Sequence, residues 1–255
     1  MGNMVLAVCG KGGTGKTTLS ALLIKSLLKS GASPILAVDA DPNSNLAPAI
    51  GMKVDQTVGQ VLEEFHGQKL TIPQGMSKQA FLELRLNQAL AEAKGIDLLE
   101  MGRPEGSGCY CSANAVLRDM IERLTDNYPH VVMDNEAGME HLSRRTAHRI
   151  DVLMMVTDPS MKGVRTVKGL FELVQELGLA VVKKYIVMSR TDKIDPRLEE
   201  ALKEVPVPVL GTVPEDPVVT DYDLEMKSFL ELPDDSAAVA SVDKMLEKIR
   251  SDWNA

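Results

Sequence analysis

Short runs of apolar residues recur along the chain, separated by longer amphipathic stretches. The runs are almost continuously apolar and bounded by turn residues, which is typical of strands buried on both faces of a parallel sheet. Strands are predicted at residues 5–9, 35–38, 96–100, 131–134, 152–156, 185–188 and 208–210. Helices are predicted at residues 17–30, 113–127, 164–177 and 197–204, where apolar positions follow helical spacing.

This alternation predicts an α/β fold with a doubly wound, mainly parallel central sheet flanked by helices. Such sheets bind ligands at the carboxyl ends of their strands. No repeat or linker divides the chain, so we expect residues 1–255 to form one domain. Residues 51–95 are polar and helical in pattern, and we expect them to be an insertion on that domain.

Residues 237–253 carry apolar positions at helical spacing from Val239 to Trp253. We expect a closing helix that packs on the sheet. The alternative is a helix on a membrane surface, but its polar side mixes acidic and basic residues and lacks the basic bias of such helices.

The amino-acid composition excludes several classes of protein. With 44% hydrophobic and 25% charged residues, the 255-residue chain is neither disordered nor fibrous. No apolar run is long enough for a membrane helix, and the first residues do not resemble a signal peptide, so we expect a cytoplasmic protein without stable membrane insertion. The net charge of −8 disfavours broad binding to nucleic acid.

A glycine-rich segment, Gly10 to Thr18, follows the first strand and opens a helix. It satisfies G-x-x-x-x-G-K-[ST] in the context that a phosphate-binding loop requires. We expect Lys16 to neutralise the β- and γ-phosphates of a nucleotide and the Thr17 hydroxyl to bind Mg²⁺. The other residues predicted to bind the nucleotide are Gly12, Gly13, Thr14, Gly15 and Thr18.

A second lysine, Lys11, begins the sequence K-G-G-T-G-K-T. This sequence resembles the deviant Walker A motif of the SIMIBI-class ATPases, which include MinD, ParA, the nitrogenase iron protein and the CooC nickel-insertion ATPases. The resemblance implies a homodimer in which Lys11 acts catalytically at the nucleotide of the partner subunit. The alternative to this implied role is that Lys11 is a solvated lysine of the loop.

Two acids, Asp39 and Asp41, end the second predicted strand in D-A-D-P. Alternate residues of a strand point the same way, so both carboxylates are expected to face the phosphate site unless they are simply solvated strand ends. D-x-D-P resembles the switch I segment of the same class. That resemblance implies that Asp41 activates the attacking water and that Asp39 binds a water of the Mg²⁺ ion.

Asp134 ends another apolar strand, at the Walker B position, and is expected to hold Mg²⁺. Gly138 would act as a hinge of switch II. The run from Asp134 to Thr146, D-N-E-A-G-M-E-H-L-S-R-R-T, resembles CooC-type ATPases more closely than MinD. His141 in this run is expected to be a structural surface residue rather than a ligand.

Recognition of the base is expected at the ends of the last two strands. Ser189 and Arg190 stand where the class commonly has an Asn followed by a basic residue, and Pro214 and Glu215 resemble the later loop beside the base. Because a hydroxyl cannot reproduce the paired donor and acceptor of a carboxamide, Ser189 weakens the case for adenine selection. ATP is still expected, since the chain lacks the GTP-reading N-K-x-D pattern.

Cys109 and Cys111 lie in a glycine-rich segment. In an extended segment both sulfurs face the same side and supply half of a four-coordinate site. A two-fold axis through the ion would add the same pair from a second chain. Zn²⁺ or Ni²⁺ suits such a site, although inert buried cysteines or a redox pair are alternatives. Cys9, within the first strand, is expected in the core.

Together, these motifs resemble the CooC family and its AcsF-type relatives over residues 5–221. The resemblance implies an ATPase that closes as a dimer around ATP and Mg²⁺. It also implies delivery of nickel to a client enzyme, carbon monoxide dehydrogenase or acetyl-CoA synthase. Two alternatives remain, a positioning ATPase of the MinD/ParA kind and an ATPase that carries an iron–sulfur cluster.

Overall fold

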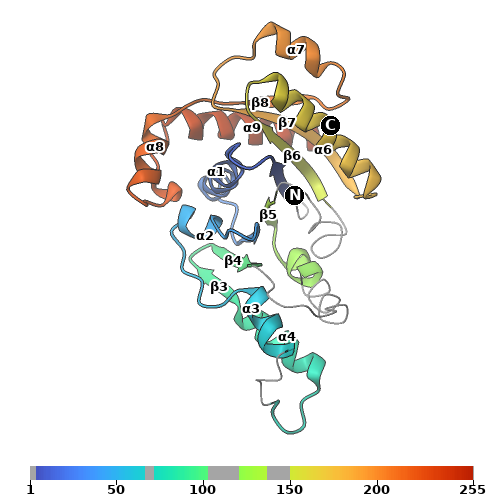
Figure 1. The fold of residues 1–255 in the computed structure, drawn as a ribbon. Coiled ribbons are helices and arrows are strands. Elements are labelled where there is room, and N and C mark those ends of the chain that lie inside the picture. The colour runs from blue at the N-terminus through green and yellow to red at the C-terminus, as the bar shows by residue number, and fades with distance from the viewer. Residues whose placement is uncertain (1–3, 67–71, 103–120, 137–149, 255) are drawn as a thin grey trace.

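A computed structural model describes residues 4–66, 72–102, 121–136 and 150–254 of the protein (Figure 1). The strands are β1 (Met4–Gly10), β2 (Ile35–Ala40), β3 (Leu90–Ala93), β4 (Ile96–Glu100), β5 (His130–Asn135), β6 (Ile150–Thr157), β7 (Val181–Ser189) and β8 (Val209–Val213). The helices are α1 (Lys16–Lys29), α2 (Leu46–Ala49), α3 (Val58–His66), α4 (Lys78–Gln88), α6 (Met161–Glu176), α7 (Pro196–Leu202), α8 (Pro217–Leu224), the 3₁₀ turn η2 (Phe229–Glu231) and α9 (Ala237–Asn254). Residues 121–127 are also helical.

The strands form one sheet in the order β3-β4-β2-β5-β1-β6-β7-β8. Every described pairing is parallel except the antiparallel pair β3–β4. From β1 the chain proceeds to β2 on one side, whereas from β6 it proceeds to β7 and β8 on the other. The neighbouring strands β1 and β6 therefore mark a switch point in the topology, where sheets of this kind bind ligands. The predicted fold class is confirmed.

The inner strands contribute side chains to two hydrophobic cores, one on each face of the sheet, because alternate side chains of a strand point to opposite faces. In β1, Val5, Ala7 and Cys9 face the side covered by α3, α4, α6, α7 and the helix at 121–127. Leu6 and Val8 face the side covered by α1, α2, η2 and α9 (Figure 1). Cys9 is fully buried, as expected, and burial raises its thiol pKa to about 12.

Residues 51–95 contain the expected helices, α3 and α4, which extend outward from the sheet edge (Figure 1). They also contain β3, which the sequence pattern did not predict. β3 is a short edge strand with no fully buried residue, so it lacks the continuous apolar run of the inner strands. Its pairing with β4 makes this region an extension of the central sheet.

The closing helix α9 packs on α1 and β8, as predicted. Its apolar positions, including Val239, Val242 and Ile249, are buried in the core on that face. Because that face is already covered, it is not available to a membrane surface. None of the helices in the described ranges is long and apolar enough to cross a membrane.

Candidate functional site

The glycine-rich segment forms a loop between β1 and the first turn of α1. Gly15 precedes the helix with φ 84°, a conformation that a side chain rarely allows. A Cβ added to Gly10 would lie 2.3 Å from the carbonyl oxygen of Val156, so only glycine fits between β1 and β6. The loop therefore brings the free N–H groups of the helix start to the switch point of the sheet, where an anion is favoured.

Thr17 and Asp134 meet across the site, as expected of a Mg²⁺-binding pair. The Thr17 hydroxyl donates to Asp134 Oδ2 over 2.6 Å, and Asp134 is completely buried. The other carboxylate oxygen, Oδ1, is buried without a hydrogen-bond partner. A buried oxygen without a partner beside a hydroxyl fits Mg²⁺, which prefers oxygen ligands. Thr17 and Asp134 would hold the ion, which neutralises phosphate charge when bound.

Asp39 organises the loop that follows β2. Its two oxygens accept hydrogen bonds from the backbone N–H groups of Asp41 (3.0 Å) and Leu46 (2.8 Å). Asp39 is fully buried, and its side chain lines neither of the cavities described below. Asp41, nearly buried, does line a cavity, and its Oδ1 accepts from the backbone and side chain of Asn43. The structure thus separates the two acids: Asp39 shapes the loop and Asp41 faces the site.

Three buried carboxylates lie in register across neighbouring strands. Asp39 pairs with Glu100 of β4 on one side and with Asp134 of β5 on the other. Burial raises the pKa of Asp39 to about 7, against the lowering effect of the Leu46 N–H, and the Asp134 carboxylate raises it further. Burial also raises the pKa of Asp134 to about 6. The ionised form of Asp134 is therefore unfavourable while no cation neutralises it, which fits its expected position beside Mg²⁺.

Two cavities meet at the loop. We call the smaller one, of about 540 Å³, the phosphate cavity, because Lys16, Thr17 and Asp41 line it. We call the larger one, of about 840 Å³, the base cavity. Its lining includes the four residues predicted to recognise a base: Ser189, Arg190, Pro214 and Glu215. Both cavities are lined by Gly13, Gly15, Thr18, Asp223 and Phe229. The cleft is thus continuous, with one end suited to phosphates and the other to a base.

The predicted loop residues differ in how they contribute. Gly12 lines the phosphate cavity, whereas Thr14 lines neither cavity and donates to the carbonyl oxygen of Lys11 over 2.7 Å. Lys16 is buried at 6% exposure beside the phosphate cavity. Thr14 therefore holds the loop's shape, and Lys16 faces the place where phosphates would lie.

Lys11 is exposed and lines neither cavity of its own chain. Contact with the amino group of Lys162, at the start of α6, lowers the pKa of Lys11. Both residues therefore present positive charge at the surface beside the loop. The expected role of Lys11 at a partner's nucleotide stays a prediction.

Part of the lining of the base cavity comes from α8, a helix that the sequence pattern did not predict. Asp216 caps α8 by accepting from the backbone N–H of Val218, and it also accepts from Ser236 (2.6 Å) and from the N–H of Ala238 in α9 (3.0 Å). Although burial alone would raise it, these hydrogen bonds hold the pKa of Asp216 below its usual value. One carboxylate thus fixes the starts of two helices.

A sequence signal for α8 was present. Asp216 followed by Pro217 is a typical helix start, with a capping acid before a proline at the first helical position. Nothing in the local sequence indicates that Asp223 and Lys227, near the other end of α8, line the phosphate cavity. Their position there depends on the tertiary placement of α8.

Several predicted residues lie outside the described ranges. They are the pair Cys109 and Cys111, the hinge Gly138, His141, and the first part of the predicted helix at 113–127. Within residues 121–127 that helix is confirmed. Among the described residues, no group of three or more His, Cys, Asp or Glu side chains is arranged to hold a metal ion.

Comparison with known proteins agrees with this geometry. The nucleotide-binding domain described as CobQ/CobB/MinD/ParA matches residues 5–229. An uncharacterised ATP-binding protein of Methanocaldococcus jannaschii is 42% identical, over 96% of this chain and 98% of its own. The carbon monoxide dehydrogenase accessory protein CooC of Rhodospirillum rubrum is 32% identical over 70% and 72%. The structure of MinD from Pyrococcus horikoshii with Mg-ADP superposes with a TM-score of 0.70 at 23% identity, covering 98% and 96%.

Proposed function

Because the chain belongs to the CobQ/CobB/MinD/ParA family of nucleotide-binding proteins and is an ATPase, we propose that its ATP cycle drives metal delivery. The cargo is nickel, or zinc, bound by Cys109 and Cys111 where two copies of the chain meet. The client is a nickel enzyme, carbon monoxide dehydrogenase or acetyl-CoA synthase. ATP and Mg²⁺ occupy the continuous cleft and bring the two copies together.

The observation that carries the proposal is the Cys-x-Cys pair in a chain 32% identical to CooC. Two thiolates supply only half of a tetrahedral site. A second copy related by a two-fold axis supplies the other half without any further ligand. The exposed position of Lys11, away from its own cleft, supports a face-to-face arrangement of the two subunits.

The described residues also support a link between the nucleotide and the cysteine segment. The backbone N–H of Met101, directly after β4, donates to the carbonyl oxygen of Asp39 over 2.8 Å. The carbonyl oxygen of Met101 in turn accepts from the N–H of Gly59 in α3. The chain that leads to Cys109 is therefore bound to the acid that shapes the loop of Asp41. Release of the γ-phosphate rearranges such loops in nucleotide switches. ATP hydrolysis would therefore change the position of Met101, from which the chain continues toward Cys109.

The test is metal content of anaerobically purified protein, measured together with its mass in solution, with and without ATP. We expect about one nickel or zinc ion per two chains in the wild type, by analogy with a shared four-thiolate site. The Cys109→Ser/Cys111→Ser double variant should lose the ion. A matched Cys9→Ala variant should keep it, because Cys9 is a core residue. Unchanged metal content in the double variant, or a single subunit under every condition, would overturn the proposal.

A positioning ATPase is the second candidate, and its support is the structural likeness to MinD. Such a protein would bind liposomes or DNA in an ATP-dependent way and would not need the cysteines. Sedimentation with both partners, using the double cysteine variant alongside the wild type, separates the two functions. A brown colour in the anaerobic protein would instead favour an iron–sulfur carrier.

A further inference from the structure

The phosphate cavity contains a cation that the phosphate loop does not supply. Among the described residues that line it, the cations are Lys16 and Lys227 and the acids are Asp41 and Asp223. Lys16 belongs to the loop motif, whereas Lys227 follows α8, more than two hundred residues later. A triphosphate brings several negative charges, and Asp41 and Asp223 add two more. Lys16 and a bound Mg²⁺ would therefore still leave this end of the cleft negative once ATP is bound.

The backbone around Lys227 is held in a defined position. The N–H of Lys227 donates to the carbonyl oxygen of Tyr222 over 2.8 Å, which closes the end of α8. Met226, just before it, adopts φ 53°, a left-handed conformation that is uncommon for a side chain of this kind. Strained backbone of this type is concentrated at functional sites. On the other side, Phe229 is buried in the core.

The neighbouring loop is fixed as well. Ser228 packs so closely on Gly51, after α2, that a Cβ at Gly51 would lie 2.8 Å from that of Ser228. The carbonyl oxygen of Leu230 accepts from the Lys25 ammonium of α1 over 3.1 Å. The segment after α8 is therefore attached to both α1 and α2, the helices that flank the phosphate cavity. Lys227 is presented from this attached segment.

The side chain of Lys227, by contrast, is free to change partner. Its ammonium pairs with Glu225 over 2.5 Å and lies 5.5 Å from the centre of the Tyr222 ring. Both side chains of the ion pair are about half exposed, at 52% and 56%. Ion pairs this exposed contribute little, because water screens them and ordering two long side chains costs entropy. A phosphate with a higher charge can displace the Glu225 carboxylate.

We propose that Lys227 is a phosphate-binding residue of the ATP site, which exchanges Glu225 for a phosphate oxygen when the nucleotide binds. Lys227 is assigned to the phosphates and not to the base, because it lines the phosphate cavity and not the base cavity. The proposal concerns ATP binding alone and does not depend on metal delivery.

The experiment compares the dissociation constants of Mg-ATP, ADP and adenosine by calorimetry at low salt. In Lys227→Gln the dissociation constant for ATP should rise about tenfold, as for loss of one charge-assisted hydrogen bond, while that for adenosine stays within about twofold. Lys227→Arg should retain most of the affinity. Glu225→Gln, which frees the lysine, should tighten ATP binding by about two- to threefold.

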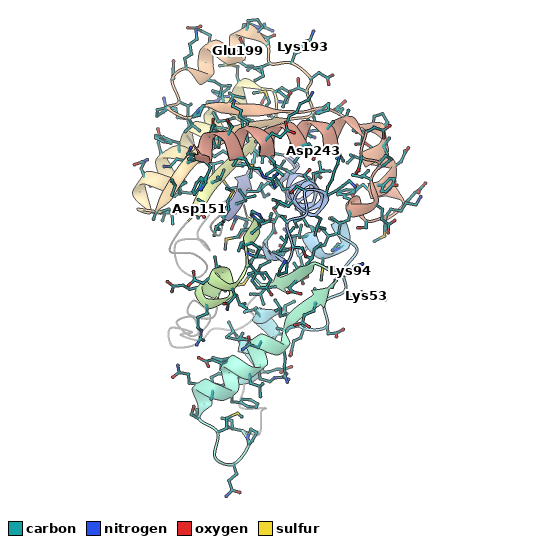
Figure 2. The ribbon with its side chains drawn as sticks, turned by 180° about the vertical axis from the view of Figure 1, so that it is seen from behind. Lys53, Lys94, Asp151, Lys193, Glu199 and Asp243 are labelled. Atoms are coloured by element: carbon teal, nitrogen blue, oxygen red, sulfur yellow. The ribbon has the colours of Figure 1, made fainter. Side chains whose placement is uncertain are left out.

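Lys94→Gln is the matched control, because it removes the same charge from an exposed lysine at the β3–β4 turn, at the opposite end of the strands (Figure 2). It should leave all three constants unchanged. An ATP constant within about twofold of wild type in Lys227→Gln would overturn the proposal. Equal weakening of ATP and adenosine would also overturn it, since it would show that Lys227 only supports the shape of the cleft.

Discussion

The phosphate cavity and the base cavity are adjacent, yet they are built in different ways. The phosphate cavity is lined by the glycine-rich loop and the start of α1, by residues that follow β2, among them Asp41, and by the segment after α8. The base cavity shares part of that loop but is otherwise lined mainly by the ends of β7 and β8, the residues that follow them, and α8, which has no buried residue. Phosphate recognition therefore depends mainly on loops beside the buried central strands, whereas base recognition depends more on a later helix held at both ends by hydrogen bonds.

The difference predicts that substitutions in the phosphate cavity change rate and cation binding, while those in the base cavity change nucleotide preference. The largest effect is expected for Asp41→Ala. Asp41 lines the phosphate cavity, and its carboxylate accepts hydrogen bonds from Asn43, which lies outside the glycine-rich loop. The turnover number for ATP should fall by about 10²- to 10⁴-fold if Asp41 is the general base, with the dissociation constant for ATP changed by less than about threefold.

Single-turnover hydrolysis and equilibrium binding, measured on the same preparation, separate these two quantities. Asn43→Ala serves as the control, since it removes the side-chain partner of Asp41 and leaves the carboxylate. A proportional loss of binding and turnover in Asp41→Ala would show that Asp41 maintains the cavity rather than acting on water.

A smaller effect, on stability, is expected for Asp134→Asn. Burial raises the pKa of Asp134 from 3.8 to about 6 in the folded chain. The folded state therefore holds a proton that the unfolded state has lost, and stability without nucleotide falls as the pH rises from about 4 to about 6. Above that range the ionised Asp134 carboxylate stays buried and destabilises the fold by the full amount. The amide of the Asn variant removes this destabilisation, and its oxygen still accepts the hydrogen bond from the Thr17 hydroxyl.

At pH 8 the nucleotide-free Asp134→Asn variant should be more stable by roughly 1–3 kcal/mol, with a melting temperature higher by about 2–8 °C. The gain should vanish near pH 4, and the stabilisation of the wild type by Mg-ATP should be lost. Scanning calorimetry across this pH range measures all three. A variant that melts below the wild type at pH 8 would show that the buried carboxylate does not destabilise the nucleotide-free protein.

The smallest effect is expected in the base cavity, for Ser189→Ala. The Ser189 hydroxyl donates to the carbonyl oxygen of Thr157 over 3.2 Å, so its oxygen offers only lone pairs to a bound base. An acceptor there suits the amino group of adenine and not the carbonyl of guanine. Removing it should weaken ATP by about three- to tenfold, leave GTP unchanged, and leave the turnover number at saturating ATP unaltered.

Competition between ATP and GTP in Ser189→Ala and Ser189→Thr measures this preference. Threonine keeps the hydroxyl and should keep the selectivity. If alanine lowered the turnover number and left the preference intact, base and phosphate recognition would not be separable in the way that the two cavities suggest.

The same division explains how much the sequence predicts. The phosphate loop, Asp134 and the inner strands were predicted because each depends on neighbouring residues or on continuous apolar runs. β3 was missed because Leu90–Ala93 is short, only partly covered and rich in residues that also favour helices. Its strand conformation comes from pairing with β4, which is a tertiary effect.

The base cavity shows the other limit. Pro214 and Glu215 were placed beside the base by family resemblance, and the structure brings them to the cavity. Lys227 was not predicted, because its distance from Lys16 along the chain conceals their shared cavity. A local pattern reports which residues form a helix, but not what that helix covers.

The carboxylate of Asp216 gives α8 and α9 a common attachment point. A displacement of α9 would therefore also disturb the start of α8, some twenty residues earlier in the chain, which lines the base cavity. We therefore expect nucleotide exchange in this ATPase to respond to changes in the position of α9, most of which lies outside the base cavity.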